Sequence, residues 1–208
     1  VNIPSAEYKY IFAHVGEAER FVTKLIANAP YNTIEATIDH RSDAVNVNSL
    51  AEVKTSWGNV GYSVIHENKR NGFKSSLALT TPFRGYEEIG AAVEHTGDQW
   101  TSFKTSAKVT LQMGVISAAI DHSGDWRRFE TTFSIASPFQ SFRTLEINLD
   151  HTASDYTRIV SSARMTTPVG EFGLNLNHNG DWRKMTTTGS INTPFSGYEN
   201  FNLNIEHD

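Results

Sequence analysis

The side chains with the widest chemical repertoire in this chain are eight histidines, and their spacing is regular. Imidazole groups bind metal ions, act as general bases or change charge near neutral pH. Here the histidines recur at nearly constant intervals over the whole chain, from His14 to His207. Such a series indicates an array of one small unit, which must be recognised before any single site. The eight are His14, His40, His66, His95, His122, His151, His178 and His207.

A second series of residues sets the full period of the array. Pro82, Pro138 and Pro194 recur at one constant interval, which spans two histidine intervals, so each period consists of two similar halves. Turn sequences such as Gly124-Asp125 and Gly180-Asp181 follow the histidines. About 9 to 11 residues separate one turn from the next, which is typical of strands in a hairpin meander rather than of helices.

Apolar and polar residues alternate within these segments, so one face of each strand is apolar. Glu146, Asn148 and Asp150 illustrate the polar face of the segments that lead to a histidine, and Lys104 and Arg164 that of the returning segments. Opposite charges on neighbouring strands help to set their register. The apolar positions are Ile34, Ile38, Ile89, Val93, Ile116, Ile120, Phe129, Phe133, Leu145, Ile147, Leu149, Phe172, Leu174, Leu176, Phe201, Leu203 and Ile205.

The sequence predicts an all-β fold. It is an antiparallel up-and-down meander of about 15 amphipathic strands on a 56-residue (2 × 28) repeat, which forms a large curved one-sided sheet. Residues 1–208 form a single module, in which 1–29 is the least regular part. We predict a strand rather than a helical turn over 17–26. The sequence ends at His207-Asp208, where other copies begin a turn, so we expect a longer natural polypeptide.

Composition excludes several functional classes. The chain has no cysteine, which removes disulfides and thiolate chemistry, and its net charge of −5 is interleaved, with no basic patch for nucleic acid. There is neither a transmembrane helix nor a visible signal segment. Serine, histidine and aspartate recur by repetition rather than as one distinguished set, so we predict that the chain is not an enzyme and has no metal site or cofactor.

The predicted apolar face is too large to remain in water. Fifteen strands at about 4.8 Å and ten residues at about 3.4 Å give a sheet of roughly 70 by 34 Å. Soluble monomers rarely expose more than a few hundred Å² of contiguous apolar surface. We therefore expect a cover, provided by closure of the sheet, another segment or subunit, or lipid.

The turn phrases resemble those of a known family. Residues 79–87 (Leu-Thr-Thr-Pro-Phe-Arg-Gly-Tyr-Glu) and 191–199 (Ile-Asn-Thr-Pro-Phe-Ser-Gly-Tyr-Glu), flanked by amphipathic strands, are similar to the β-sheet regions of large lipid transfer proteins. That family includes the apolipophorins, apolipoprotein B and the vitellogenins. The resemblance implies a secreted carrier whose open sheets lay their apolar face on lipid. Its helical and lipid-entry regions have no counterpart in this chain.

The histidines and tryptophans are predicted to mark the rim of the sheet. Histidines on every second strand are about 9.6 Å apart, too far for two rings to share a zinc ion without further ligands. They are interpreted as the end of the apolar face, with a pH-responsive rim and a metal ladder as alternatives. The ring side chains that follow the turns suit an oil–water boundary or pack over the hairpin ends; they are Trp100, Trp126, Tyr156 and Trp182.

The leading functional hypothesis is binding and carriage of lipid or another hydrophobic ligand, such as a carotenoid, by a structural module of an extracellular lipoprotein. Its expected partners are lipid and the remaining segments of a larger polypeptide or further subunits, with no nucleic acid. Two alternatives remain open: an outer-membrane β-barrel, and a structural or adhesive β array without a ligand.

Overall fold

A computed structural model describes residues 9–29, 32–98 and 100–207. Within these ranges it contains β-strands joined by turns and no helix, which confirms the all-β prediction. The segment 17–26 is mostly strand, as predicted. The strands are β1 (Lys9–Glu17), β2 (Arg20–Ala29), β3 (Asn32–Ser42), β4 (Val47–Thr55), β5 (Gly58–Lys69), β6 (Gly72–Thr80), β7 (Glu88–Gly97), β8 (Ser102–Leu111), β9 (Gly114–Gly124), β10 (Arg128–Ala136), β11 (Thr144–Asp155), β12 (Arg158–Thr167), β13 (Gly170–Gly180), β14 (Met185–Asn192) and β15 (Asn200–His207).

The strands form one meander. Their hydrogen-bonded order runs without crossover from β1 to β15, and each described pair is antiparallel, as in β10 with β11 and β12 with β13. Every histidine lies on an odd-numbered strand. The predicted meander of 15 strands in an open sheet is therefore correct.

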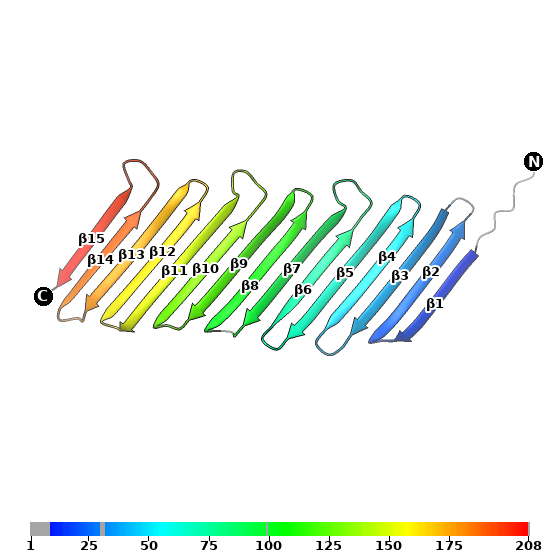
Figure 1. The fold of residues 1–208 in the computed structure, drawn as a ribbon, viewed down its shortest axis with the longest axis horizontal. Helices are drawn as coiled ribbons and strands as arrows, with labels where there is room; N and C mark the ends of the chain where they lie inside the picture. Colours follow the sequence, from blue (N-terminus) through cyan, green and yellow to red (C-terminus); the bar gives the residue numbers. More distant parts are fainter. Residues whose placement is uncertain (1–8, 30–31, 99, 208) are drawn as a thin grey trace, which may run out of the picture. The chain divides into compact units, whose positions relative to one another are not determined.

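Contacts divide the strands into two units, residues 1–94 with 108–114 and residues 95–107 with 115–208. The first unit holds the whole of β1 to β6, and the second the whole of β10 to β15. Within each unit the strands lie side by side in an open sheet (Figure 1). The pronounced curvature expected from the width of the sheet stays a prediction.

Glycines make the tight turns possible. Gly124, at the end of β9, has φ +116°, a conformation that side chains rarely adopt. A Cβ at this position would lie 2.0 Å from the carbonyl oxygen of Arg128. Gly97 and Gly180 have φ values of +119° and +124° in the equivalent turns. The Gly-Asp phrases after the histidines are therefore turns for a steric reason.

The sheet has almost no interior. Among the described residues the only buried hydrophobic side chain is Ala153, which is 7% exposed. The accessible surface of the chain is 15082 Å². A globular protein of its mass, 23.2 kDa, is expected to expose about 9,700 Å². The difference arises because one layer of strands covers neither of its own faces.

Candidate binding surface

The strand registers of the second unit place its apolar side chains on one face. Across four neighbouring strands, Phe133 is opposite Ile147, Ile147 is opposite Met165, and Met165 is opposite Phe172. Side chains of directly paired residues point to the same side of a sheet. We call this side the apolar face. In the second unit it also carries Ile120, Phe129, Leu145, Leu149, Leu174, Leu176, Phe201, Leu203 and Ile205, with Ile116 at an alternate position of β9.

The first unit has an apolar face of the same kind. Ala27 is opposite Ile34, Thr23 is opposite Ile38, and Ile38 is opposite Ala51. The predicted residues Ile89 and Val93 lie four positions apart in β7, and therefore on the same side of that strand. The opposite side of β1 and β2 is also apolar, because Ile11 pairs with Ile26.

The apolar face carries no lysine, arginine, aspartate or glutamate at the strand positions whose register is described. Its large side chains are nevertheless open to solvent, and Leu203 is 59% exposed. Within each unit the face is thus an uncharged, uncovered apolar surface. Soluble monomers rarely expose contiguous apolar surface on this scale.

The other side of the sheet is charged and internally paired. Lys24 contacts Glu35 at 2.6 Å, and Lys104 contacts Asp121 at 2.6 Å, each across neighbouring strands. The Lys24 ammonium lowers the pKa of the Glu35 carboxyl, first through its hydrogen bond. These exposed pairs help to set the strand register more than they add stability.

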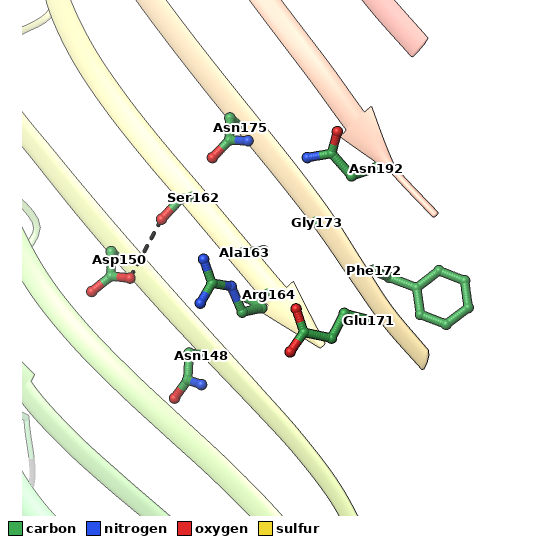
Figure 2. A pocket seen from close by; sticks show the side chains of 10 residues that line it. All are labelled: Asn148, Asp150, Ser162, Ala163, Arg164, Glu171, Phe172, Gly173, Asn175 and Asn192. Atoms are coloured by element: carbon green, nitrogen blue, oxygen red, sulfur yellow. Dashed lines mark hydrogen bonds between the residues drawn. The ribbon is translucent and has the colours of Figure 1, made fainter. Parts of the chain in front are cut away.

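A hollow lies on the charged side of β11 to β14. Its volume is about 450 Å³, and Gly173 opens it because a glycine in that row has no side chain. Figure 2 shows Arg164 beside Glu171. The Ser162 hydroxyl donates a hydrogen bond to the Asp150 carboxylate, with 3.4 Å between the two oxygens. Its lining residues are Asn148, Asp150, Ser162, Ala163, Arg164, Glu171, Phe172, Gly173, Asn175 and Asn192. Its polar groups carry both signs of charge.

The histidines close one end of the apolar face through a repeated contact. His122 Nδ1 is hydrogen-bonded to Thr131 Oγ1 on the next strand at 2.7 Å. The same contact, at 2.7 or 2.8 Å, joins His14 to Thr23, His66 to Ser75, His95 to Thr105, His151 to Ser161 and His178 to Thr187. Each of these rings thus has a hydroxyl partner within the sheet.

Phenylalanines lie between the histidines. The ring centroid of Phe129 is 5.9 Å from that of His122 and 5.0 Å from that of His151. Phe103 lies in the same way beside His122, at 5.2 Å. His40 differs, because its Nε2 contacts Ser42 at 3.1 Å, and His207 lies on β15, the last strand of the order. From His95 to His151 the rim is thus a row of alternating imidazole and phenyl rings. Opposite His178 the phenyl ring is replaced by Ile159.

The turns beyond this row form what we call the histidine edge. Trp100, Trp126, Tyr156 and Trp182 lie in these turns and are 56% to 84% exposed. The rings of Trp126 and Tyr156 are stacked, with centroids 6.0 Å apart. All four lie between strands rather than within them.

The opposite turns form the proline edge, and they repeat one set of hydrogen bonds. The Thr193 hydroxyl donates to the Tyr198 carbonyl at 2.6 Å, and the Tyr198 N–H donates to the Phe195 carbonyl at 3.0 Å. Thr81 and Tyr86 make the first of these contacts two periods earlier, also at 2.6 Å. Phe83, Phe139, Phe195 and Tyr198 are exposed along this edge. The further proline–aromatic pair, Pro30-Tyr31, lies outside the described residues.

An aspartate fixes each of several turns at the histidine edge. The Asp98 carboxylate accepts hydrogen bonds from the Thr101 hydroxyl and from the N–H groups of Trp100, Thr101 and Ser102. These bonds, the Thr101 hydroxyl first, lower the pKa of Asp98 below its usual value. Asp125 and Asp181 make the equivalent backbone bonds.

Replacing Asp98 with alanine should therefore destabilise the protein at neutral pH. A pKa that is lower in the folded than in the unfolded chain stabilises the fold above the unfolded value, and this contribution is lost as pH falls through the folded value. The wild-type and D98A urea midpoints should differ at neutral pH and converge towards about pH 2. A gap that did not narrow in acid would contradict the assignment.

Sequence reasoning missed two features of this surface. One is the hydroxyl partner of the histidines, although a Ser or Thr follows each of these histidines at a nearly constant interval, as Thr131 follows His122 and Ser161 follows His151. The other is the arginine beside the edge tryptophans, which was visible as Asp125-Trp126-Arg127 and Asp181-Trp182-Arg183.

Metal-binding clusters and membrane-spanning helices were sought in the described part of the chain. No group of three or more metal-binding side chains lies together there. The same residues include no helix with the length and hydropathy needed to cross a membrane. Comparison of the chain with protein-family models, curated proteins and solved structures found no match.

Proposed function

We propose that this chain binds and carries lipid, or another hydrophobic ligand, on its apolar face, as a structural module of an extracellular lipoprotein. The observation that carries the proposal is the uncharged apolar face, which nothing in the described part of the chain covers. The accessible surface of the whole chain is about half as large again as expected for a globular protein of its mass.

The free energy of hydration argues for an apolar cover. At about 25 cal/mol per Å², even the apolar part of the excess surface corresponds to tens of kcal/mol. Acyl chains need no hydrogen bonds from the protein and conform to a broad surface. The face offers them aliphatic and phenyl side chains such as Phe133, Ile147 and Leu203.

The aromatic residues at both edges support lipid as the cover. Tryptophan and tyrosine combine an apolar ring with one polar atom and favour the boundary between hydrocarbon and water. They are exposed at the histidine edge, as in Trp182, and at the proline edge, as in Tyr198 and Trp57. An apolar band between two aromatic margins is the pattern expected of a surface that lies on lipid.

The edge strands are where the remaining segments of a larger polypeptide, or further subunits, would join. Every residue of β15 and of β1 is exposed. Unpaired strand edges readily accept another strand. An outer-membrane barrel would instead need β1 to pair with β15.

The proposal can be tested by flotation. Purified protein is mixed with an emulsion of triolein and phosphatidylcholine and centrifuged through a density gradient. We expect it to float with the emulsion and to self-associate without lipid. Native protein should also yield extractable lipid, identified by mass spectrometry. A stable lipid-free monomer that stays at the bottom of the gradient would contradict lipid binding. Lipid-free dimers would favour a structural array in which two apolar faces pair.

A further inference from the structure

The histidine edge of the second unit is an ordered ridge rather than a set of independent turns. The Gly124 N–H donates to the Thr101 carbonyl at 2.7 Å, and the Gly180 N–H donates to the Thr157 carbonyl at 2.7 Å. Between them, the Ala153 N–H donates to the Arg127 carbonyl at 2.6 Å. These bonds link neighbouring turns, so the exposed rings on those turns keep fixed positions in one row.

Arginines lie on the exposed tryptophans of this ridge. The guanidinium carbon of Arg127 is 5.1 Å from the centroid of the Trp126 ring, and that of Arg183 is 4.9 Å from the centroid of the Trp182 ring. Both distances are within the range of a cation–π contact. Each ring therefore holds a guanidinium in place at the protein surface.

These guanidinium groups make no ion pair within the described residues. Among the arginines of the ridge only Arg128 has a carboxylate within 4.0 Å, that of Glu130 at 3.9 Å. The nearby aspartates are engaged by the turns instead: Asp125 accepts the backbone N–H groups of Arg127 and Arg128, and Asp181 accepts the backbone N–H of Arg183. The guanidinium N–H donors of Arg127 and Arg183 are thus available to an anion from outside.

The two edges of the second unit differ in charge. The turns of the histidine edge between β9 and β14 contain the cations Arg127, Arg183 and Lys184 and the anions Asp125 and Asp181. The adjoining strand ends add Arg128, Arg158 and Asp155, so cations exceed anions by two. The loops of the proline edge between β10 and β15 contain one cation, Arg143, and one anion, Glu199. The Glu199 carboxylate accepts the Gly197 N–H at 2.8 Å.

We propose that the histidine edge of the second unit binds the phosphate headgroups of anionic phospholipids. The proposal rests on the proposed function, because it places the apolar face on the acyl chains of the same lipids. Guanidinium groups form paired hydrogen bonds with phosphate oxygens. Indole rings lie at the depth of the headgroups. Cations near an anionic lipid surface add attraction that neutral lipid does not provide.

The test compares vesicles of phosphatidylcholine alone with vesicles that also contain phosphatidylglycerol, with binding followed by tryptophan fluorescence and flotation. The variant carries R127Q and R183Q. The control carries K104Q and R164Q, which remove the same charge from the charged side of the sheet in the same unit. We expect roughly fivefold weaker binding per edge arginine, about 25-fold for the pair, on anionic vesicles only. The control should change binding by less than about twofold.

Three results would overturn the inference. Wild-type protein could bind both kinds of vesicle equally, or the edge variant could lose binding equally on both. Alternatively, soluble heparin could bind wild-type protein and lose affinity in the variant with R127Q and R183Q, while wild-type protein showed no preference for anionic vesicles. That result would identify a site for soluble polyanions rather than for lipid headgroups. If wild-type protein bound no vesicle and no triolein emulsion, the proposed function itself would fail, and this inference with it.

Discussion

Protein that carries L176D and L203D together should lose its association with lipid, by roughly 100-fold or more relative to wild type. Leu176 and Leu203 lie in one row of the apolar face, on either side of Gly189. Both are exposed and are not part of any core, so their replacement leaves no internal cavity. The measurement is the lipid-bound fraction after flotation with the triolein–phosphatidylcholine emulsion.

The expected loss combines two effects. Burying a leucine side chain contributes about 1.5–3 kcal/mol, which each variant position no longer supplies. An aspartate on the same site must in addition leave water to contact hydrocarbon, which costs more unless the charge finds a partner. No cation lies on the apolar face at the described register positions to provide one.

The matched control changes the neighbouring residues. Asn177 and Asn202 adjoin these leucines in the chain and lie on the opposite side of the sheet, both exposed. N177D and N202D add the same two charges, and we expect lipid binding to change by less than about twofold. Equal losses in the two double variants would show that net charge, rather than the apolar face, governs association.

A G124A substitution should destabilise lipid-bound protein by on the order of 3 kcal/mol. Gly124 has φ +116°, and an added Cβ would collide with the Arg128 carbonyl oxygen at 2.0 Å and the Phe129 Cα at 2.6 Å. The substitution would also disturb the Gly124 N–H bond to Thr101, which joins two turns of the ridge. Urea unfolding, followed by the fluorescence of the edge tryptophans, measures the change.

Gly189 supplies the control with the opposite sign. It lies within β14, and a Cβ there would meet Asn175 O at 3.8 Å and Leu203 Cβ at 3.9 Å, which are ordinary contacts. Because glycine loses more backbone freedom than alanine on folding, G189A should stabilise by about 0.5–1 kcal/mol. A harmless G124A would show that the turn does not need a left-handed residue.

The strands and their faces could be predicted because they follow from local rules. Alternation with period two places Leu145, Ile147 and Leu149 on one side whatever their partners are. The Gly-Asp phrases predict turns because glycine readily adopts the positive φ that tight turns require. The positions of the edge tryptophans follow from these turns. In the same way, the strand over 17–26 follows from its place after a histidine.

Cross-strand partners could not be predicted in the same way. The contact of His122 with Thr131 and the row of rings around Phe129 depend on register, which backbone hydrogen bonds between strands decide. The links between turns that align Trp126 and Tyr156 also join residues of different hairpins. None of these follows from the pattern of a single strand.

The sequence by itself determined that the chain forms amphipathic strands, because the period of side chains along an extended backbone is a local property. Only the tertiary structure decided that the strands remain a single layer in which Ala153 is the one buried hydrophobic side chain of the described residues. A strand with one apolar side looks the same whether that side packs on a second layer or stays open. Layering depends on where distant strands meet, which no short stretch of sequence records.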